Sequence, residues 1–286
     1  MSEGATRPQE QWFDRLGPAF AATPLVLSVP HAGRFYPDAL IGCSAVPKAV
    51  LEELEDRHAD LLVARAVTHG AVAIVARSAR AWIDLNRGEE DLDPALRDPP
   101  GSGPPASART RSGLGLLPHR IGRRDLWKTL AAPADAAARI REIHRPYHAA
   151  IARALDDALI RHGHAVLLDC HSMPPLGGLR PARIVIGDRH GSTAAHGLAA
   201  RLAAVARAEG YSTAVNAPYA GAHAIERHGR PCEGVHAIQI EVDRSLYLLR
   251  DMRSVSTGLE AMRGLIATLA ATAAAAMRPH LDIAAE

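Results

Sequence analysis

The amino-acid sequence predicts an α/β fold in which a mixed, mostly parallel sheet is flanked by helices, within a single domain that spans residues 1–286. Short apolar runs alternate along the chain with longer segments whose apolar residues recur at helical spacing, which is the pattern of strand–helix–strand units. The runs carry few polar residues, as strands do when helices cover both faces of a sheet. The chain also shows no internal repeat and no clear linker, which favours one domain.

The expected strands are short apolar runs that end at a turn or at a charged group. They cover residues 24–29, 72–77, 81–86, 164–172, 182–188 and 235–248. The run AWIDLN at 81–86 comes shortly after the run VAIVAR at 72–77, so we expect two short strands around a turn.

The expected helices are longer segments with apolar residues at helical spacing. They cover residues 47–67, 124–163, 192–210 and the alanine-rich remainder from about residue 252. Pro47 suits the first turn of a helix, Pro146 should kink or divide the second helix because it lacks an N–H, and Gly210 should close the third. Residues 88–115 are rich in glycine, proline and charge, so we expect a loop, either a functional lid or a disordered segment.

Composition and charge exclude several classes of protein. Of the 286 residues, 48% are hydrophobic, which is typical of a globular chain. The formal net charge is +2 and the arginines form no basic stripe, so we expect no nucleic-acid partner. The stretch GLIATLAATAAAAM is too short and too weakly apolar for a membrane span, and the N-terminus lacks a signal-peptide pattern. We therefore expect no membrane partner and a cytoplasmic location. The three cysteines form no CxxC pair, which argues against a disulfide framework or a thiolate zinc site.

Two histidines directly follow apolar strands and are the strongest candidates for chemistry. His31 ends LVLSVPH and His171 ends AVLLDCH. Ligands bind beyond the carboxyl ends of parallel strands, and Asn86, Asp188 and Glu241 also stand at or near strand ends, so all five side chains can converge. Neutral imidazole is the commonest metal ligand, and three protein ligands with one open position are typical of catalytic zinc. Two unrelated histidines at strand ends are the alternative interpretation.

A third ligand would have to be an oxygen or nitrogen donor, and the segment LEDRHAD offers three acids around His58. Asp56 and Asp60 are four residues apart, so they lie on one face of the expected helix. Glu55 is another candidate from the same segment. The alternative interpretation is a solvated acidic helix face.

Glu241 is an unusual residue within the apolar run AIQIEVDR. Burial there would raise the pKa of its carboxyl towards the range that suits a general base. A structural ion pair with Arg244 would also explain a glutamate at this position.

Other polar residues are candidates for substrate binding. Asn86 and Arg87 follow each other at the end of WIDLNR, where a planar guanidinium can bind a carboxylate through two hydrogen bonds and the amide can add a donor. A surface arginine paired with nearby acids is the alternative. The turn-rich segment NAPYAGAHAIERHGRPCEG, which contains Asn216 and Tyr219, suits a substrate-binding loop.

Taken together, these motifs resemble the N-formylglutamate amidohydrolase family. The resemblance rests on an ordered set that covers residues 25 to 250: LSVPHAG, EDRHADLL, IDLNR, GLGLLP, HRPYHAAI, LLDCHSMP, IVIGDRHG, NAPYAGAHAIERHG and HAIQIEVDRSLYL. The family is similar in fold to the zinc carboxypeptidases and the aspartoacylase-like deacylases. The resemblance therefore implies a zinc-carboxypeptidase-like, phosphorylase/hydrolase-like fold.

The resemblance also implies roles for individual residues. It implies one divalent metal ion, expected to be zinc, held by His31, His171 and Asp56, with Asp60 or Glu55 as alternatives to Asp56.

Asn86 and Arg87 resemble the pair that holds a substrate carboxylate in carboxypeptidase-like enzymes, and Glu241 resembles their general base. Arg244 is the next candidate for a carboxylate anchor. Asp169 is expected to orient a metal ligand.

The founding activity of this family is hydrolysis of N-formyl-L-glutamate to formate and L-glutamate in histidine breakdown. We therefore expect a metal-dependent hydrolase of linear amides that acts on a small molecule. The alternatives are a deacylase or peptidase of another N-acyl amino acid, and a non-catalytic binding protein; the sequence predicts no oligomeric state. His190 and His223 stand where the family pattern has other residues, which bears on acyl and side-chain specificity.

Overall fold

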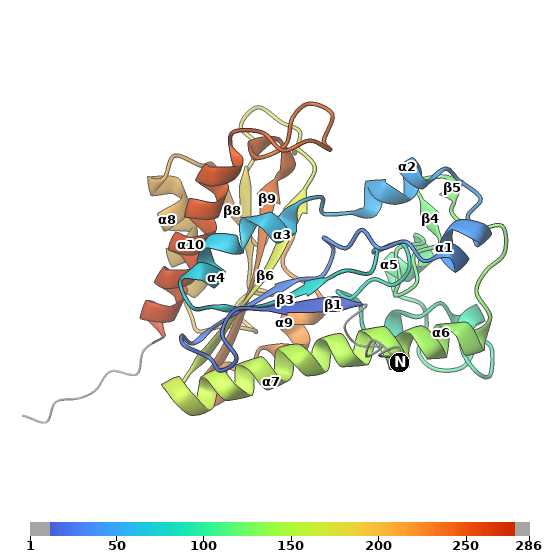
Figure 1. Cartoon of the computed structure of the whole chain (residues 1–286), viewed down its shortest axis with the longest axis horizontal. Coiled ribbons are helices and arrows are strands. Elements are labelled where there is room, and N and C mark those ends of the chain that lie inside the picture. The colour runs from blue at the N-terminus through green and yellow to red at the C-terminus, as the bar shows by residue number, and fades with distance from the viewer. Residues whose placement is uncertain (1–11, 278–286) are drawn as a thin grey trace, which may run out of the picture.

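A computed structural model describes residues 12–277 of the chain, and it contains a seven-stranded sheet in the order β1-β3-β2-β6-β9-β7-β8 (Figure 1). The strands are β1 (Phe13–Leu16), β2 (Leu25–Val29), β3 (Val72–Ala76), β6 (Ala165–Met173), β7 (Ile184–Gly187), β8 (Thr213–Val215) and β9 (Val235–Asp243). The central strands β3, β2, β6 and β9 are parallel. At the edges, β1 is antiparallel to β3, and β7 is antiparallel to β9 and parallel to β8. The prediction of a mixed, mostly parallel sheet is confirmed.

Helices cover both faces of the sheet. The helices are α1 (Asp38–Cys43), α2 (Lys48–Leu51), α3 (Ala59–Leu62), α4 (Ala64–Thr68), α5 (Ala108–Arg111), α6 (Pro133–Arg139), α7 (Arg145–His162), α8 (Leu198–Ala208), α9 (His223–His228) and α10 (Leu259–Ala276). In Figure 1, α7 runs along one face, and α3, α4, α8 and α10 lie on the other. Successive residues of a strand point to opposite faces, so Leu25 and Leu27 pack towards α8 and α10, while Val26 packs towards α7.

The predicted helix at 47–67 is broken into short pieces, so this prediction is wrong in its continuity. Helix α2 and a 3₁₀ turn end at Leu54, Glu55 is extended, and His58 adopts a left-handed conformation with φ of 62°. The chain then resumes as α3 and α4. Tertiary contacts impose the break, because the Asp56 N–H donates to the carbonyl of His31 at 2.9 Å instead of to a helical carbonyl.

The predicted strand at 81–86 is also wrong, since this segment forms turns above the sheet. The prediction for Pro146 is confirmed: a π-helical turn at Ile140–His144 separates α6 from α7, and Pro146 lies in the first turn of α7. Residues 88–115 form a long connection that contains only two 3₁₀ turns and the short helix α5. The edge strands β1 and β8 were not predicted.

Helix α10 requires a third correction. It is 18 residues long, and its mean hydropathy of 1.2 makes it long and apolar enough to cross a membrane by length and composition alone. The stretch GLIATLAATAAAAM is thus part of a longer helix, and the expectation that it is too short and weakly apolar does not hold. The helix packs against α4, α8 and the sheet, and 44% of it is buried. Its apolar residues are those of a core helix, with Leu265, Ile266 and Leu269 facing the sheet layer.

Candidate active site

Three neighbouring parallel strands bring the main candidate residues to one edge of the sheet. His31 follows β2 after Pro30, His171 lies near the end of β6, and Glu241 lies near the end of β9. In the register between β6 and β9, His171 is directly opposite Glu241. Gly33 allows the chain to turn after His31, because a Cβ there would lie 2.0 Å from the carbonyl oxygen of Ser78.

Asp56 completes a group of three possible metal ligands. Its Oδ2 lies 2.9 Å from Nδ1 of His171 and 3.4 Å from Nδ1 of His31. All three residues are buried, and one ligand atom from each lies within 4.8 Å of the others. The sequence therefore predicted a set of residues that the fold brings together from three distant segments.

A carboxylate fixes the orientation of each imidazole. Nε2 of His31 donates to Asp84 Oδ1 at 2.7 Å, and Nε2 of His171 donates to Asp169 Oδ2 at 2.8 Å. Nδ1 of each ring faces Asp56, and with the proton on Nε2 it would offer its lone pair to a metal ion. Such carboxylate–histidine pairs are typical partners of metal-ligating histidines. Within residues 12–277, Nδ1 of His31 has no hydrogen-bond partner, which is the state expected of a ligand atom.

Asp56 is held as an ionised ligand. Burial opposes its ionisation, but interactions with the adjacent imidazoles of His171 and His31 outweigh it and hold the pKa of Asp56 well below its usual range. Arg244 donates from Nη2 to the other carboxylate oxygen, Oδ1, at 3.0 Å. Arg244, which was predicted to bind substrate, thus contacts Asp56, a candidate metal ligand, directly.

The two other candidate acids lie elsewhere. Glu55 accepts a hydrogen bond from the Tyr36 hydroxyl at 2.6 Å, and Asp60 pairs with Arg34 at 3.0 Å. Asp56 and Asp60 do not share a helical face, because the helix is broken between them. The structure brings only Asp56 to the histidines.

Glu241 lines a cavity of about 200 Å³ together with His31, Asp56 and His171. Burial raises the pKa of Glu241 to about 7. Gln239 donates from Nε2 to Oε1 of Glu241 at 2.9 Å, which leaves Oε2 free of that bond. A buried carboxylate with such a pKa can both accept and release a proton near neutral pH.

Four arginines also line this cavity: Arg80, Arg87, Arg109 and Arg244. Nε of Arg80 donates to Asp84 Oδ2 at 2.9 Å. Arg87 is buried, and it donates from Nη1 to the Asn86 carbonyl at 2.7 Å and from Nε to the Leu114 carbonyl at 3.1 Å. The cavity wall therefore carries four guanidinium groups, which can bind an anionic ligand.

The remaining predicted residues are placed differently. The Asn86 amide is turned inwards, donating to Asp169 Oδ2 at 3.2 Å and accepting from the Ala224 N–H at 2.8 Å, although Asn86 lines the cavity. Tyr219 lines the cavity. Asn216 instead donates from Nδ2 to Asp188 Oδ1 at 2.7 Å, away from the cavity lining.

The direction of strand β7 explains the position of Asp188. Because β7 runs antiparallel to β9, the carboxyl end of β7 faces away from the edge that carries His171 and Glu241. The expectation that Asp188 converges with the strand-end histidines is wrong for this reason.

Sequence reasoning missed three residues of the site. Asp84 carried a usable signal, since it is an acid within an apolar run, as Glu241 is. Arg80 and Arg109 carried none, because single arginines in loops are common. Arg109 lies on α5 in the long 88–115 connection, and only the fold places it at the cavity.

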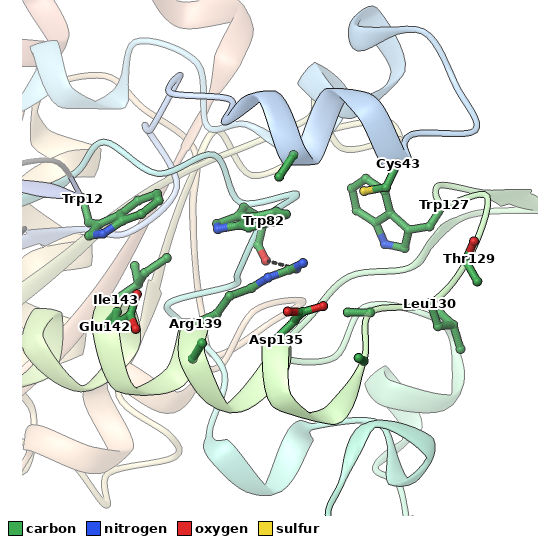
Figure 2. A pocket seen from close by; sticks show the side chains of 14 residues that line it. Trp12, Cys43, Trp82, Trp127, Thr129, Leu130, Asp135, Arg139, Glu142 and Ile143 are labelled. Carbon is green, nitrogen blue, oxygen red and sulfur yellow. Dashed lines mark hydrogen bonds between the residues drawn. The ribbon is translucent and has the colours of Figure 1, made fainter.

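A second, larger cavity lies apart from this site. Its volume is about 420 Å³, and it shares no lining residue with the active cavity. Figure 2 shows Trp12, Trp82 and Trp127 around it, with the Arg139 guanidinium 3.3 Å from the centroid of a Trp82 ring. Its lining is mainly apolar and brings together no histidine–acid group, so the smaller cavity is the candidate active site.

Replacing Asp84 with asparagine tests the role of the carboxylate behind His31. We expect Asp84→Asn to weaken zinc binding by about 10–100-fold, because a neutral amide no longer favours the proton on Nε2. Competition with a chromophoric chelator measures this affinity. Asp188→Asn is the matched control, a buried acid outside the cavity, and it should keep the wild-type affinity. Equal zinc affinities of Asp84→Asn and the wild type would contradict the assignment.

Comparisons with known proteins identify the family of the chain. The family model for N-formylglutamate amidohydrolase matches residues 23–248. The N-formylglutamate deformylases of Pseudomonas aeruginosa and Pseudomonas putida are 33% and 31% identical over 235 and 238 residues, in each case 79% of this chain and 82% of the relative. The crystal structure of N-formylglutamate amidohydrolase from Ralstonia eutropha JMP134 is 32% identical and superposes with a TM-score of 0.84, covering 94% of this chain and 99% of the other. The chain therefore belongs to the N-formylglutamate amidohydrolase family and is a hydrolase of amide bonds.

Proposed function

We propose that this chain hydrolyses N-formyl-L-glutamate to formate and L-glutamate, with Glu241 as general base beside a metal site formed by His31, Asp56 and His171. The observation that carries the proposal is the shared cavity. It brings a buried His–Asp–His group and a carboxylate with a pKa of about 7 together, in a chain of this family.

The donor set fits a divalent ion, which we propose to be zinc. Two imidazole nitrogens and one carboxylate oxygen are the ligand types of catalytic zinc sites, and they leave one position open. The unpartnered Nδ1 of His31 supports this fit. When bound, such an ion acts as a Lewis acid that polarises a carbonyl and makes water more acidic.

Glu241 would move the protons of the reaction. As the oxygen of water bonds to the formyl carbon, Oε2 or Oε1 of Glu241 accepts a proton from that water. Glu241 then delivers this proton to the amide nitrogen as the C–N bond breaks. The products are formate and the free amine of L-glutamate, so one water is consumed for each amide.

Arginines would position the substrate and stabilise charge. Arg80 lines the cavity beside the ligand histidines, and its terminal guanidinium N–H groups can donate to the oxygen on which negative charge develops. Arg87 would bind the α-carboxylate through its planar fork and hold the amide at a fixed distance from Glu241. Arg244 would act through Asp56, which it contacts directly.

Arg109 would recognise the side-chain carboxylate of the substrate. N-Formylglutamate carries two carboxylates at neutral pH, so a selective site needs a second cation beyond Arg87. Arg109 is exposed at the cavity lining, and its side chain forms no hydrogen bond or ion pair with any part of the chain that the structure describes. A cation without a protein partner is available for a ligand.

Arg109→Ala is expected to lower kcat/KM on N-formyl-L-glutamate by about fivefold, equivalent to about 1 kcal/mol for a solvent-accessible ion pair. With N-formyl-L-norvaline, which lacks the side-chain carboxylate, the same variant should match the wild type. Arg123→Ala removes an exposed positive charge away from the cavity and serves as the control. An equal loss on both substrates would remove Arg109 from side-chain recognition.

A substrate panel tests the proposed activity. Formate or acyl release is measured from N-formyl-L-glutamate, N-acetyl-L-glutamate, N-formyl-L-norvaline and a glutamyl dipeptide. The proposal requires N-formyl-L-glutamate to have the highest kcat/KM. Preference for the acetyl compound would indicate a general deacylase, preference for the dipeptide a peptidase, and no turnover a binding protein.

A place in histidine breakdown and a cytoplasmic location are further parts of the proposal.

A further inference from the structure

A second group of histidines lies outside the lining of the active cavity. His144 ends the π-helical turn that precedes α7, His148 lies one turn later in α7, and His223 and His228 are the first and last residues of α9. The ring centroids of His144, His148 and His223 are 4.5, 5.7 and 5.1 Å apart in pairs. His144 and His148 are fully buried, with 0% exposure.

Backbone carbonyls fix the tautomers of the two α7 histidines. Nε2 of His144 lies 2.8 Å from the Arg87 carbonyl oxygen, and Nε2 of His148 lies 3.0 Å from the Leu85 carbonyl oxygen. A carbonyl oxygen only accepts, so both Nε2 atoms carry the proton and both Nδ1 atoms carry a lone pair. This is the arrangement that backbone carbonyls impose on metal-ligating histidines.

Two buried nitrogen atoms of the group lack a partner. Nδ1 of His144 and Nε2 of His223 form no hydrogen bond with the described residues 12–277. An unsatisfied buried polar atom costs about 1–3 kcal/mol, so native proteins rarely leave one without a reason. Nδ1 of His148 is engaged, since it accepts from Nε2 of His228 at 3.0 Å.

We propose that His144, His148 and His223 form a binding site for a second divalent transition-metal ion of the zinc class. One ligand nitrogen from each residue lies within 4.8 Å of the others. Two histidines four residues apart present their rings on one side of a helix, as in known zinc sites. Binding exchanges the His148–His228 hydrogen bond for three metal–nitrogen bonds.

The chemistry of the group selects the class of metal. Burial lowers the pKa of His144 and His148, and lowers that of His223 to about 4, so the imidazoles are neutral as ligands must be. The three ligands are all nitrogen donors, which suits zinc, nickel or copper and disfavours magnesium and calcium.

The site would brace the wall of the active cavity. His144 and His148 hold the carbonyls of Arg87 and Leu85, which flank Asn86. From α9, the N–H of Ala224 donates to the Asn86 side chain. An ion bound to α7 and α9 together would therefore fix the Leu85–Arg87 segment.

Metal stoichiometry separates the two sites. Each protein is loaded with zinc, passed through a desalting column, and its zinc per chain is measured by atomic emission. We expect two ions in the wild type, one in the His31→Ala, Asp56→Ala double variant, one in His223→Leu, and none when all three changes are combined. His190→Ala changes an exposed histidine outside both groups and should keep two ions.

Cobalt and thermal unfolding provide readouts that do not depend on activity. The double variant loaded with Co²⁺ should keep visible absorption bands and lose them when His223→Leu is added. Zinc should raise Tm of the double variant, and the rise should disappear with His223→Gln, which serves if His223→Leu does not fold. A double variant that binds no zinc, or a His223 variant that keeps two ions, would overturn the proposal while leaving the proposed activity intact.

Discussion

Replacing Glu241 with glutamine is expected to lower kcat on N-formyl-L-glutamate by about 10²-fold or more, because the variant cannot accept the proton of the attacking water. The change is nearly isosteric, and the hydrogen bond from Gln239 Nε2 can persist with an amide oxygen at position 241. Zinc content and KM should therefore stay close to those of the wild type. Single-turnover formate release and atomic emission on the same preparation measure both properties.

Glu55→Gln is the matched control for this variant. Glu55 is also a buried acid, and burial raises the pKa of its carboxyl, but it bonds to the Tyr36 hydroxyl outside the cavity lining. Its kcat should equal that of the wild type. If Glu241→Gln folds, binds zinc and turns over normally, Glu241 has no part in proton transfer.

Arg87→Ala is expected to lose about 2–4 kcal/mol of transition-state binding, a fall of about 30- to 1000-fold in kcat/KM. Arg87 is only 3% exposed, so a carboxylate bound to it is largely desolvated. The loss should occur with N-formyl-L-glutamate and largely vanish with its α-amide, which lacks the charge. Arg87→Lys should recover part of the activity, since an ammonium group cannot form the bidentate pair.

Arg139→Ala provides the control for removing a partly buried guanidinium. Arg139 lines the larger, tryptophan-lined cavity and stacks on Trp82, so its loss should leave the ratio of acid to amide turnover unchanged (Figure 2). Wild-type activity in Arg87→Ala, or equal cleavage of acid and amide by the wild type, would place the carboxylate anchor elsewhere. Arg244 would then be the next residue to test.

The central strands could be predicted because both of their faces are covered. Strands β2, β6 and β9 are buried at every position, so each appears in the sequence as a run rich in apolar residues. The edge strand β1 could not be predicted, because its burial is only partial and half of its short sequence, FDRL, is charged. The same reasoning fails for the direction of β7, since an apolar run carries no sign of its orientation.

The ligand residues could be predicted only in part. His31 and His171 were visible because each follows a strand, but the position of Asp56 depends on contacts with residues far along the chain. Its N–H bonds to His31 and its carboxylate to His171 and Arg244, and these contacts override the helical periodicity of Leu51, Leu54 and Leu62. Periodicity within 47–67 is compatible with a continuous helix and with the broken one.

The role of Asp84 was hidden for a related reason. WIDLNR was interpreted as a strand, in which Asp84 and Asn86 would share one face, whereas the segment forms turns that aim Asp84 at His31 and Arg80. An acid within an apolar run is visible in the sequence, but its pairing with a histidine 53 residues away leaves no local signal.

The most direct test of the central claim is formate release from N-formyl-L-glutamate by one preparation in three states. The states are zinc-loaded, metal-depleted by chelation and desalting, and zinc-restored. We expect the depleted protein to retain less than about one hundredth of the zinc-loaded rate and zinc to restore it, because the amide needs both the Lewis acid and Glu241. Full turnover by the depleted protein, or no formate from the zinc-loaded one, would contradict a metal-dependent N-formylglutamate amidohydrolase at this site.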